Sequence, residues 1–106
     1  MTIERPAGEV YAFVSDLKNL PTWASGLSAA VKVRFVERNA LGVLDHFVRV
    51  DSGPEVYMPM RVFPNGEGAE VLITVFRQQG ISDEKFAEDT HWVRRDLEAL
   101  KTLLEK

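Results

Sequence analysis

Apolar residues recur at a helical spacing near the start of the chain. They stand at Val10, Phe13, Val14 and Leu17. This spacing of three and four residues predicts an amphipathic helix over about residues 6–16. Pro6 favours a helix start here, because the first helical turn leaves its N–H groups unpaired and proline has none to offer. A short strand is expected just before it, at residues 2–4.

A second short helix is predicted directly afterwards. Asn19 is a good N-cap, Pro21 fits the first turn, and Gly26 favours a helix end. Trp23 lies within this short and broken segment. We interpret this segment as closing one end of the sheet, with Trp23 as a corner residue that packs against the long C-terminal helix predicted below.

The middle of the chain changes to a period of two, which is typical of strands. Apolar and polar residues alternate from Val31 onward. Four strands are predicted, at residues 31–38, 43–50, 56–62 and 71–77. The turns between them are short, and the neighbours Asn65 and Gly66 are a strong hairpin signal. These short turns predict an antiparallel meander.

The last part of the chain predicts one long helix over about residues 83–105. Its apolar stripe consists of Phe86, Val93, Leu97, Leu100 and Leu104. Ser82 or Asp83 is expected to cap its N-terminus. The residues expected to be buried together are Phe13, Leu17, Trp23, Val93, Leu97 and Leu100. Helices gathered on one face of an antiparallel sheet make an α+β fold.

Composition and charge are those of an ordinary globular chain. The 106 residues are 45% hydrophobic and 27% charged, which fits a single domain over residues 1–106. The net charge of −3 and the dispersed basic residues argue against nucleic acid as the main partner. The chain has no cysteine, which excludes disulfides and zinc–thiolate sites. Short apolar runs predict no membrane span, the charged N-terminus does not look like a signal peptide, and a cytoplasmic location is expected.

Several stretches together resemble a known superfamily. They are IERPAGEVYAFVSDLKNLPTWASGL, RNALGVLDHFV, MPMRVFPNGEGAEV, FRQQGISDEKFAED and FAEDTHWVRRDLEALKTLLEK. The chain resembles the START-like, or SRPBCC, proteins and among them a bacterial subgroup described as polyketide cyclase/dehydrase-like. The resemblance implies a helix-grip fold, in which an antiparallel sheet wraps a long C-terminal helix and two short helices follow the first strand.

The chain departs from that superfamily between the second short helix and the strand at Val31. Relatives usually have about a hairpin more at this point. The shortening implies a sheet of about five strands and a cavity that is small, open on one side, or closed by a second copy of the chain. A homodimer is therefore one expectation, because an open sheet edge invites pairing with another chain.

His46 is the first candidate for chemistry. By strand alternation it shares a face with Leu44, Val48 and Val50, so an imidazole is expected on an apolar face. It is either a hydrogen-bonded core histidine or a polar anchor that lines a ligand cavity. A metal role is disfavoured, because His91 is the only other histidine and no ligand-spaced cluster accompanies it.

Asp89 and Asp96 form the second candidate group. Both are expected beside the apolar stripe of the long helix, where an unpaired carboxylate is costly to bury. Arg77 follows an alternating strand and is the expected partner for one of them. The pair is either a structural tie between helix and sheet or a charged group held for an acidic or hydroxylated ligand.

Met58, Met60 and Trp92 are the remaining candidates. The two methionines flank Pro59 and share one strand face, and methionine adapts to irregular space. Each residue is read either as core packing or as cavity wall. Pro59 indicates an edge position or a bulge, because proline cannot donate to a strand ladder.

The resemblance and these residues predict binding of a small hydrophobic or amphipathic molecule between the sheet and the C-terminal helix. The candidate ligand-binding residues are His46, Met58, Met60, Arg77, Trp92 and Asp96. One alternative is a cyclase or dehydratase that uses His46 with Asp89 or Asp96. Another is a protein-interaction module, either co-chaperone-like or homodimeric. No catalytic residue, cofactor or metal site is assigned, since no nucleophile elbow, phosphate loop or metal motif occurs.

Overall fold

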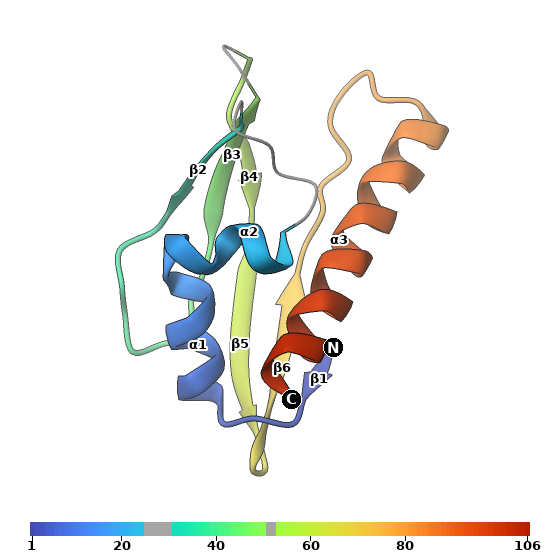
Figure 1. The fold of residues 1–106 in the computed structure, drawn as a ribbon. Helices are drawn as coiled ribbons and strands as arrows, with labels where there is room; N and C mark the ends of the chain where they lie inside the picture. The colour runs from blue at the N-terminus through green and yellow to red at the C-terminus, as the bar shows by residue number, and fades with distance from the viewer. Residues whose placement is uncertain (25–30, 51–52) are drawn as a thin grey trace.

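The structure, a computed structural model, describes residues 1–24, 31–50 and 53–106. It is an α+β fold that ends in one long helix (Figure 1). The elements follow in the order β1 (Thr2–Ile3), α1 (Ala7–Ser15), the 3-10 turn η1 (Leu17–Asn19), α2 (Leu20–Trp23), β2 (Val31–Phe35), β3 (His46–Val50), β4 (Val56–Met58), β5 (Met60–Asn65), β6 (Gly68–Ile73) and α3 (Asp83–Leu104). The expected end of the second helix at Gly26 lies outside the described residues.

Among the described residues, the strands form two antiparallel sheets of three strands each. One has the order β1-β6-β5 and the other β2-β3-β4. The hairpin predicted at Asn65 and Gly66 is confirmed, since Asn65 pairs with Gly68 across a tight turn and Gly66 has a positive φ of 62°. Because of that turn, β6 already begins at Gly68, and the last strand occupies an earlier part of the sequence than the predicted residues 71–77.

The division into two sheets occurs at Pro59, which alone separates β4 from β5. His46 lies opposite Met58, and a single bridge places Val43 opposite Arg61, so both sides of the break keep one register. In that register Asp45 faces Pro59. The Pro59 carbonyl accepts from the Thr74 N–H at 2.9 Å on the other side of the strand, and proline has no N–H to donate in return. The expected continuous strand 56–62, and with it one sheet of about five strands, is therefore replaced by two sheets joined through this segment.

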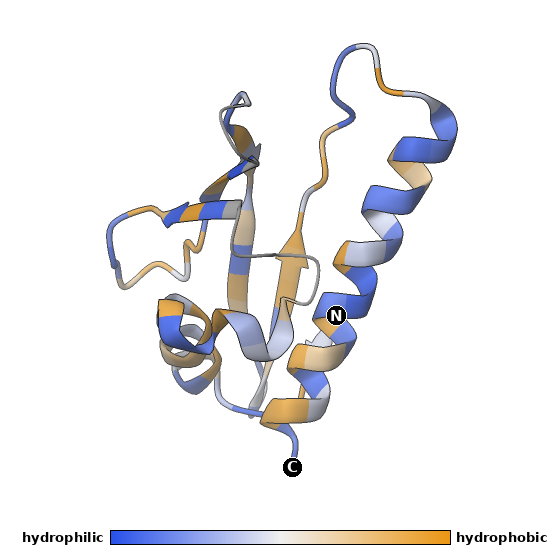
Figure 2. Ribbon diagram, turned by 45° about the horizontal axis from the view of Figure 1, so that its top comes forward, coloured by the Kyte–Doolittle hydropathy of each residue, from blue (hydrophilic) through white to orange (hydrophobic). Residues whose placement is uncertain are grey.

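The core lies between the sheet β1-β6-β5, helix α1 and the C-terminal half of α3. Its buried hydrophobic residues are Ile3, Val10, Val14, Trp23, Ala24, Leu44, Met60, Val62, Ala69, Val71, Leu100 and Leu104. Figure 2 shows hydrophobic residues gathered on β6 and at the C-terminal end of α3, whereas hydrophilic residues predominate toward its N-terminus. The core is thus concentrated in one half of the molecule.

Only some of the residues predicted to form the core are buried. Trp23 and Leu100 are buried, while Phe13 and Leu97 pack at the margin of the core. Leu17 was expected inside, but 52% of its surface is exposed. The reason is that α1 ends at Ser15, so Leu17 belongs to η1 and no longer follows the helical face of Val10 and Val14.

Helix α3 agrees with the predicted helix to within one residue at its C-terminus. The Ser82 hydroxyl accepts a hydrogen bond from the Lys85 N–H at 3.1 Å, which caps its first turn. The helix packs against α2 and β1. Its N-terminal half extends toward the same end of the molecule as β2, β3 and β4, and the segment that links β6 to α3 runs between them (Figure 1). Within the described part of the chain, no helix has the length and apolar character needed to cross a membrane.

Leu100→Ala tests this placement of the core. We expect it to lower the free energy of unfolding by about 2–5 kcal/mol, because truncating a fully buried leucine leaves a cavity. Leu17→Ala is the matched control and should cost less than about 1 kcal/mol, since that side chain is half exposed. Urea unfolding measures both. Equal losses for the two variants would contradict the division between core and surface.

Candidate functional site

A groove of about 690 Å³, partly open to solvent, lies between the sheet β2-β3-β4 and the N-terminal half of α3. The sheet contributes a wall that consists of Val33, His46, Val48, Val56 and Met58. Consecutive strand residues point to opposite faces, so these alternating positions share the face toward the helix. All of them except His46 are apolar.

Helix α3 supplies the opposite wall. The lining residues are Lys85, Glu88, Asp89, Trp92, Val93 and Asp96. They are spaced three and four positions apart, which places them on one face of the helix. This wall is largely polar, unlike the sheet wall. The groove therefore has one apolar side and one charged side.

Trp23 closes the end of the groove where α2 meets α3. It lines the groove, only 3% of its surface is exposed, and α2 packs on α3. Its indole N–H is buried and has no hydrogen-bond acceptor among the described residues. Burying an N–H group without a hydrogen-bond acceptor is costly. The indole N–H can therefore donate to an acceptor on a molecule that enters the groove, or to a protein acceptor that moves next to it.

His46 is the polar group of the sheet wall, and 9% of its surface is exposed. Its Nδ1 lies 3.0 Å from the Leu44 carbonyl oxygen, and its ring packs 5.0 Å from the ring of Phe35. Burial lowers the pKa of His46 more than that carbonyl and Asp45 raise it. The ring is therefore neutral at pH 7. With Nδ1–H donating to Leu44, Nε2 is left as an acceptor.

Asp45 points to the opposite face of the sheet and is also buried, with 6% of its surface exposed. Its carboxylate accepts hydrogen bonds from the Met60 N–H at 2.9 Å, from the Tyr57 hydroxyl at 2.6 Å and from Arg61. Burial by itself would raise the pKa of Asp45, but these bonds and the Arg61 charge lower it overall. The bond to Asp45 raises the pKa of the Tyr57 hydroxyl. This network holds the backbone beside Pro59.

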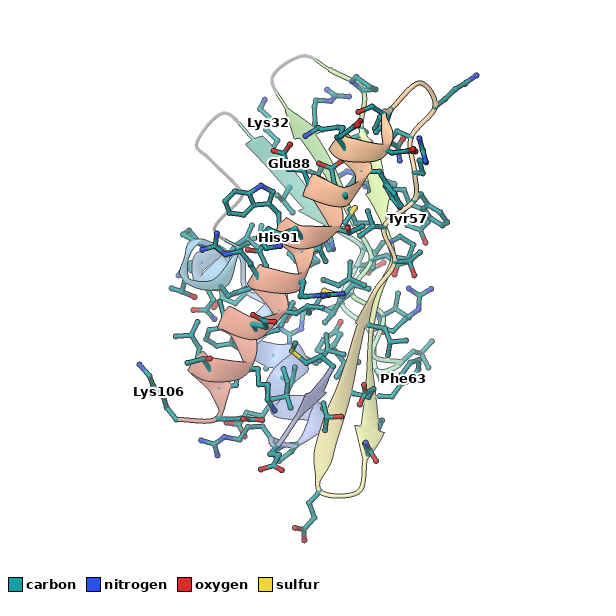
Figure 3. All side chains as sticks on the ribbon, turned by 90° about the vertical axis from the view of Figure 1, so that its right-hand side faces the viewer. Lys32, Tyr57, Phe63, Glu88, His91 and Lys106 are labelled. Atoms are coloured by element: carbon teal, nitrogen blue, oxygen red, sulfur yellow. The ribbon has the colours of Figure 1, made fainter. Side chains whose placement is uncertain are left out.

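The outer face of the sheets carries aromatic side chains. Figure 3 shows Tyr57 and Phe63 on the side facing away from α1 and α2. Tyr57 stacks between Phe47 and Phe76, at ring distances of 5.3 and 6.2 Å. The Arg34 guanidinium covers Phe47 at 4.4 Å. These rings contact one another, so the row stabilises the sheet face.

Four of the six predicted site residues line the groove. His46 and Met58 come from the sheet, while Trp92 and Asp96 come from α3. Met60 does not line it, because it lies beyond the break at Pro59 and is fully buried in the core. Arg77 does not line it either and is about half exposed.

The expected pairing of Arg77 with Asp89 or Asp96 is not found. Arg77 instead forms an ion pair with Asp83 at 2.7 Å and donates to the Ile81 carbonyl at 2.8 Å. The physical reason is that β6 ends at Ile73, so strand alternation no longer directs residue 77 toward the helix. Asp89 pairs with Lys85 at 2.9 Å, one helical turn away.

Sequence reasoning missed three features of this site. Glu88 and Lys85 line the groove, and their spacing from Trp92 and Asp96 on one helix face was the available signal. The buried Asp45 carried no such signal, because its partner position at Pro59 is known only once the strand register is known. In the described part of the chain, no three His, Cys, Asp or Glu side chains are placed to hold a metal ion.

No protein-family model matches the chain, and no curated protein matches it significantly.

Asp45→Asn tests the network at Pro59. We expect it to lower the free energy of unfolding by about 1–3 kcal/mol at neutral pH, because charge-assisted hydrogen bonds from Met60, Tyr57 and Arg61 are weakened. Folding lowers the pKa of this carboxyl from its ordinary value of 3.8. Its stabilisation is therefore present above that value and is lost as pH falls through the folded-state pKa.

The difference in free energy of unfolding between the original protein and Asp45→Asn should therefore shrink as the solution is acidified below about pH 4. Urea unfolding at a series of pH values measures it. Glu67→Gln, at an exposed position of the hairpin turn, is the control and should leave stability almost unchanged. A difference that stays constant on acidification would show that Asp45 is not the titrating group.

Proposed function

We propose that the protein binds a small hydrophobic or amphipathic molecule in the groove between β2-β3-β4 and α3. The observation that carries this proposal is the groove itself, about 690 Å³ in volume, with an apolar sheet wall and one buried imidazole. Ligand sites of this size are typically apolar with a few polar groups that fix orientation. His46 is the group that would orient a bound molecule.

Membership of the START-like superfamily, with its helix-grip fold, belongs to the same proposal. The order of elements supports it: a short strand, two short helices, antiparallel strands and a long C-terminal helix. A fold alone does not determine a function, since one fold can carry unrelated activities. The groove therefore supports the binding proposal more directly than the resemblance does.

The enzymatic alternative has less support from the site. A cyclase or dehydratase would need His46 within hydrogen-bond reach of a carboxylate that orients it. Among the described interactions, the His46 ring bonds to the Leu44 carbonyl, and Asp89 bonds to Lys85. The groove thus favours binding over acid–base catalysis.

A symmetric homodimer through β2 is disfavoured by charge. Strand β2 is at one end of its sheet, so its outer edge has no strand partner among the described residues. Antiparallel pairing of two copies about Val33 would place Lys32 of each copy opposite Arg34 of the other. Like charges directly opposite each other destabilise a strand pair. Cationic side chains on an edge strand instead protect it from pairing.

A groove-filling variant tests the binding proposal with a neutral probe, 2-naphthaleneethanol. Val33→Trp should weaken its binding at least about tenfold, because the added indole occupies space beside the apolar wall. Lys32→Trp is the matched control, since residue 32 is next on the same strand and points to the other face. NMR chemical-shift titration gives both dissociation constants. Equal affinities, or no binding to the original protein, would contradict the proposal.

His46→Leu tests the role of the imidazole. A hydrogen bond from the ligand hydroxyl to His46 Nε2 should contribute about 0.5–1.5 kcal/mol to the binding free energy. The variant should therefore bind 2-naphthaleneethanol about two- to tenfold more weakly. Binding of 2-ethylnaphthalene, which has no hydroxyl, should change little. Circular-dichroism melting checks that the variant is folded. If both probes lose affinity equally, His46 shapes the wall and does not act as a hydrogen-bonding anchor.

A further inference from the structure

We infer that the groove selects molecules that carry a protonated amine on an apolar or aromatic body. This inference rests on the proposed binding function and specifies the chemical class of the ligand. The helix wall carries its charge: three carboxylates, Glu88, Asp89 and Asp96, face the groove with one ammonium, Lys85. Lys85 is already engaged by Asp89 at 2.9 Å. The wall is therefore net negative.

The other walls contribute no compensating cation. The sheet wall is apolar apart from the neutral His46. Lys32 and Arg34 alternate with Val33 and point to the opposite face, where Arg34 pairs with Glu55 at 3.2 Å. Arg77 is held by Asp83 outside the groove. By sequence, residues 25–30 and 51–52 contain no lysine or arginine, so they cannot add positive charge.

The negative groups are arranged along one line of the helix. Glu88, Trp92 and Asp96 are four residues apart and so follow one another on successive turns. In Figure 3, Glu88 lies on the part of α3 toward its N-terminus. A cation beside the Trp92 ring would have a carboxylate one turn away on either side. Indole rings attract cations, and Arg95, which does not line the groove, makes one such contact with the Trp92 ring at 5.0 Å.

Apart from the buried Trp23 N–H and the Lys85 ammonium, which Asp89 already engages, the polar groups of the groove named above are hydrogen-bond acceptors. With its Nδ1–H donating to Leu44, His46 offers Nε2 as an acceptor, and the carboxylates of α3 accept only. A ligand that presents an N–H donor can bond to His46 Nε2, whereas a carboxylate ligand offers it no donor and meets like charge on α3. An apolar or aromatic body matches Val48, Val56 and Met58 on the facing wall.

The test compares three probes that share one ring and differ in the polar end. They are 2-(2-naphthyl)ethylamine, 2-naphthaleneethanol and 2-naphthaleneacetate, which are cationic, neutral and anionic at neutral pH. NMR titration of the full chain gives each dissociation constant. We expect the amine to bind at least about tenfold more tightly than the carboxylate, with the alcohol between them. The ratio of the affinity for the amine to the affinity for the carboxylate should fall as the salt concentration rises.

Glu88→Gln and Asp96→Asn locate the effect. Each should reduce the amine-to-carboxylate ratio about threefold or more while leaving the alcohol nearly unchanged. Glu98→Gln is the matched control, because it removes the same charge from the same helix at an exposed position outside the lining. The control ratio should stay close to that of the original protein. Melting curves verify that all variants are folded.

The outcomes separate the two levels of the inference. Equal binding of all three probes, or tightest binding of the carboxylate, would overturn amine selectivity and leave the binding function standing. An amine preference that Glu98→Gln reduces as much as Glu88→Gln would show general surface attraction and overturn the assignment to the groove. Failure of all three probes to bind would overturn the proposed function and this inference with it.

Discussion

The hydrogen bond from the Met60 N–H to the Asp45 carboxylate is the interaction on which both sheets depend. Pro59 interrupts the strand that serves both sheets, and Asp45 faces it in the register. The Asp45 carboxylate accepts a hydrogen bond from the Met60 N–H at 2.9 Å, in place of the backbone carbonyl that would accept it in an uninterrupted pair of strands. Its burial is tolerated because Tyr57 and Arg61 also donate to it. Without these donors, a buried charge would stand unpaired beside a broken ladder.

This break divides the molecule into a filled half and an open half. On one side, β1-β6-β5, α1 and the C-terminal end of α3 enclose the core. On the other, β2-β3-β4 and the N-terminal half of α3 are separated by the groove. His46 stands at this boundary, next to Asp45 in sequence. Because consecutive strand residues point to opposite faces, anchoring Asp45 outward directs His46 into the groove.

The candidate site was predictable where a residue's own element determines its direction. Periodicity on α3 and β3 was enough to select Trp92, Asp96 and His46, which do line the groove. It failed at Arg77, which lies beyond the last strand residue, Ile73. It also failed at Met60, which shares a strand face with Met58 but lies over the core. Both failures come from where an element ends or divides, which local pattern does not fix.

The sequence by itself determined the element types, their order and the antiparallel pairing of neighbours. These follow from local properties: the spacing of apolar side chains, the cap at Ser82 and the tight turn at Gly66. Only the tertiary structure decided that the strands form two sheets, and that one half of α3 is packed while the other faces a groove. The reason is that the pairing of Asp45 with the backbone beside Pro59 joins residues distant in sequence. Such a contact exists only once the strands are in register, so no periodicity along the chain can reveal it.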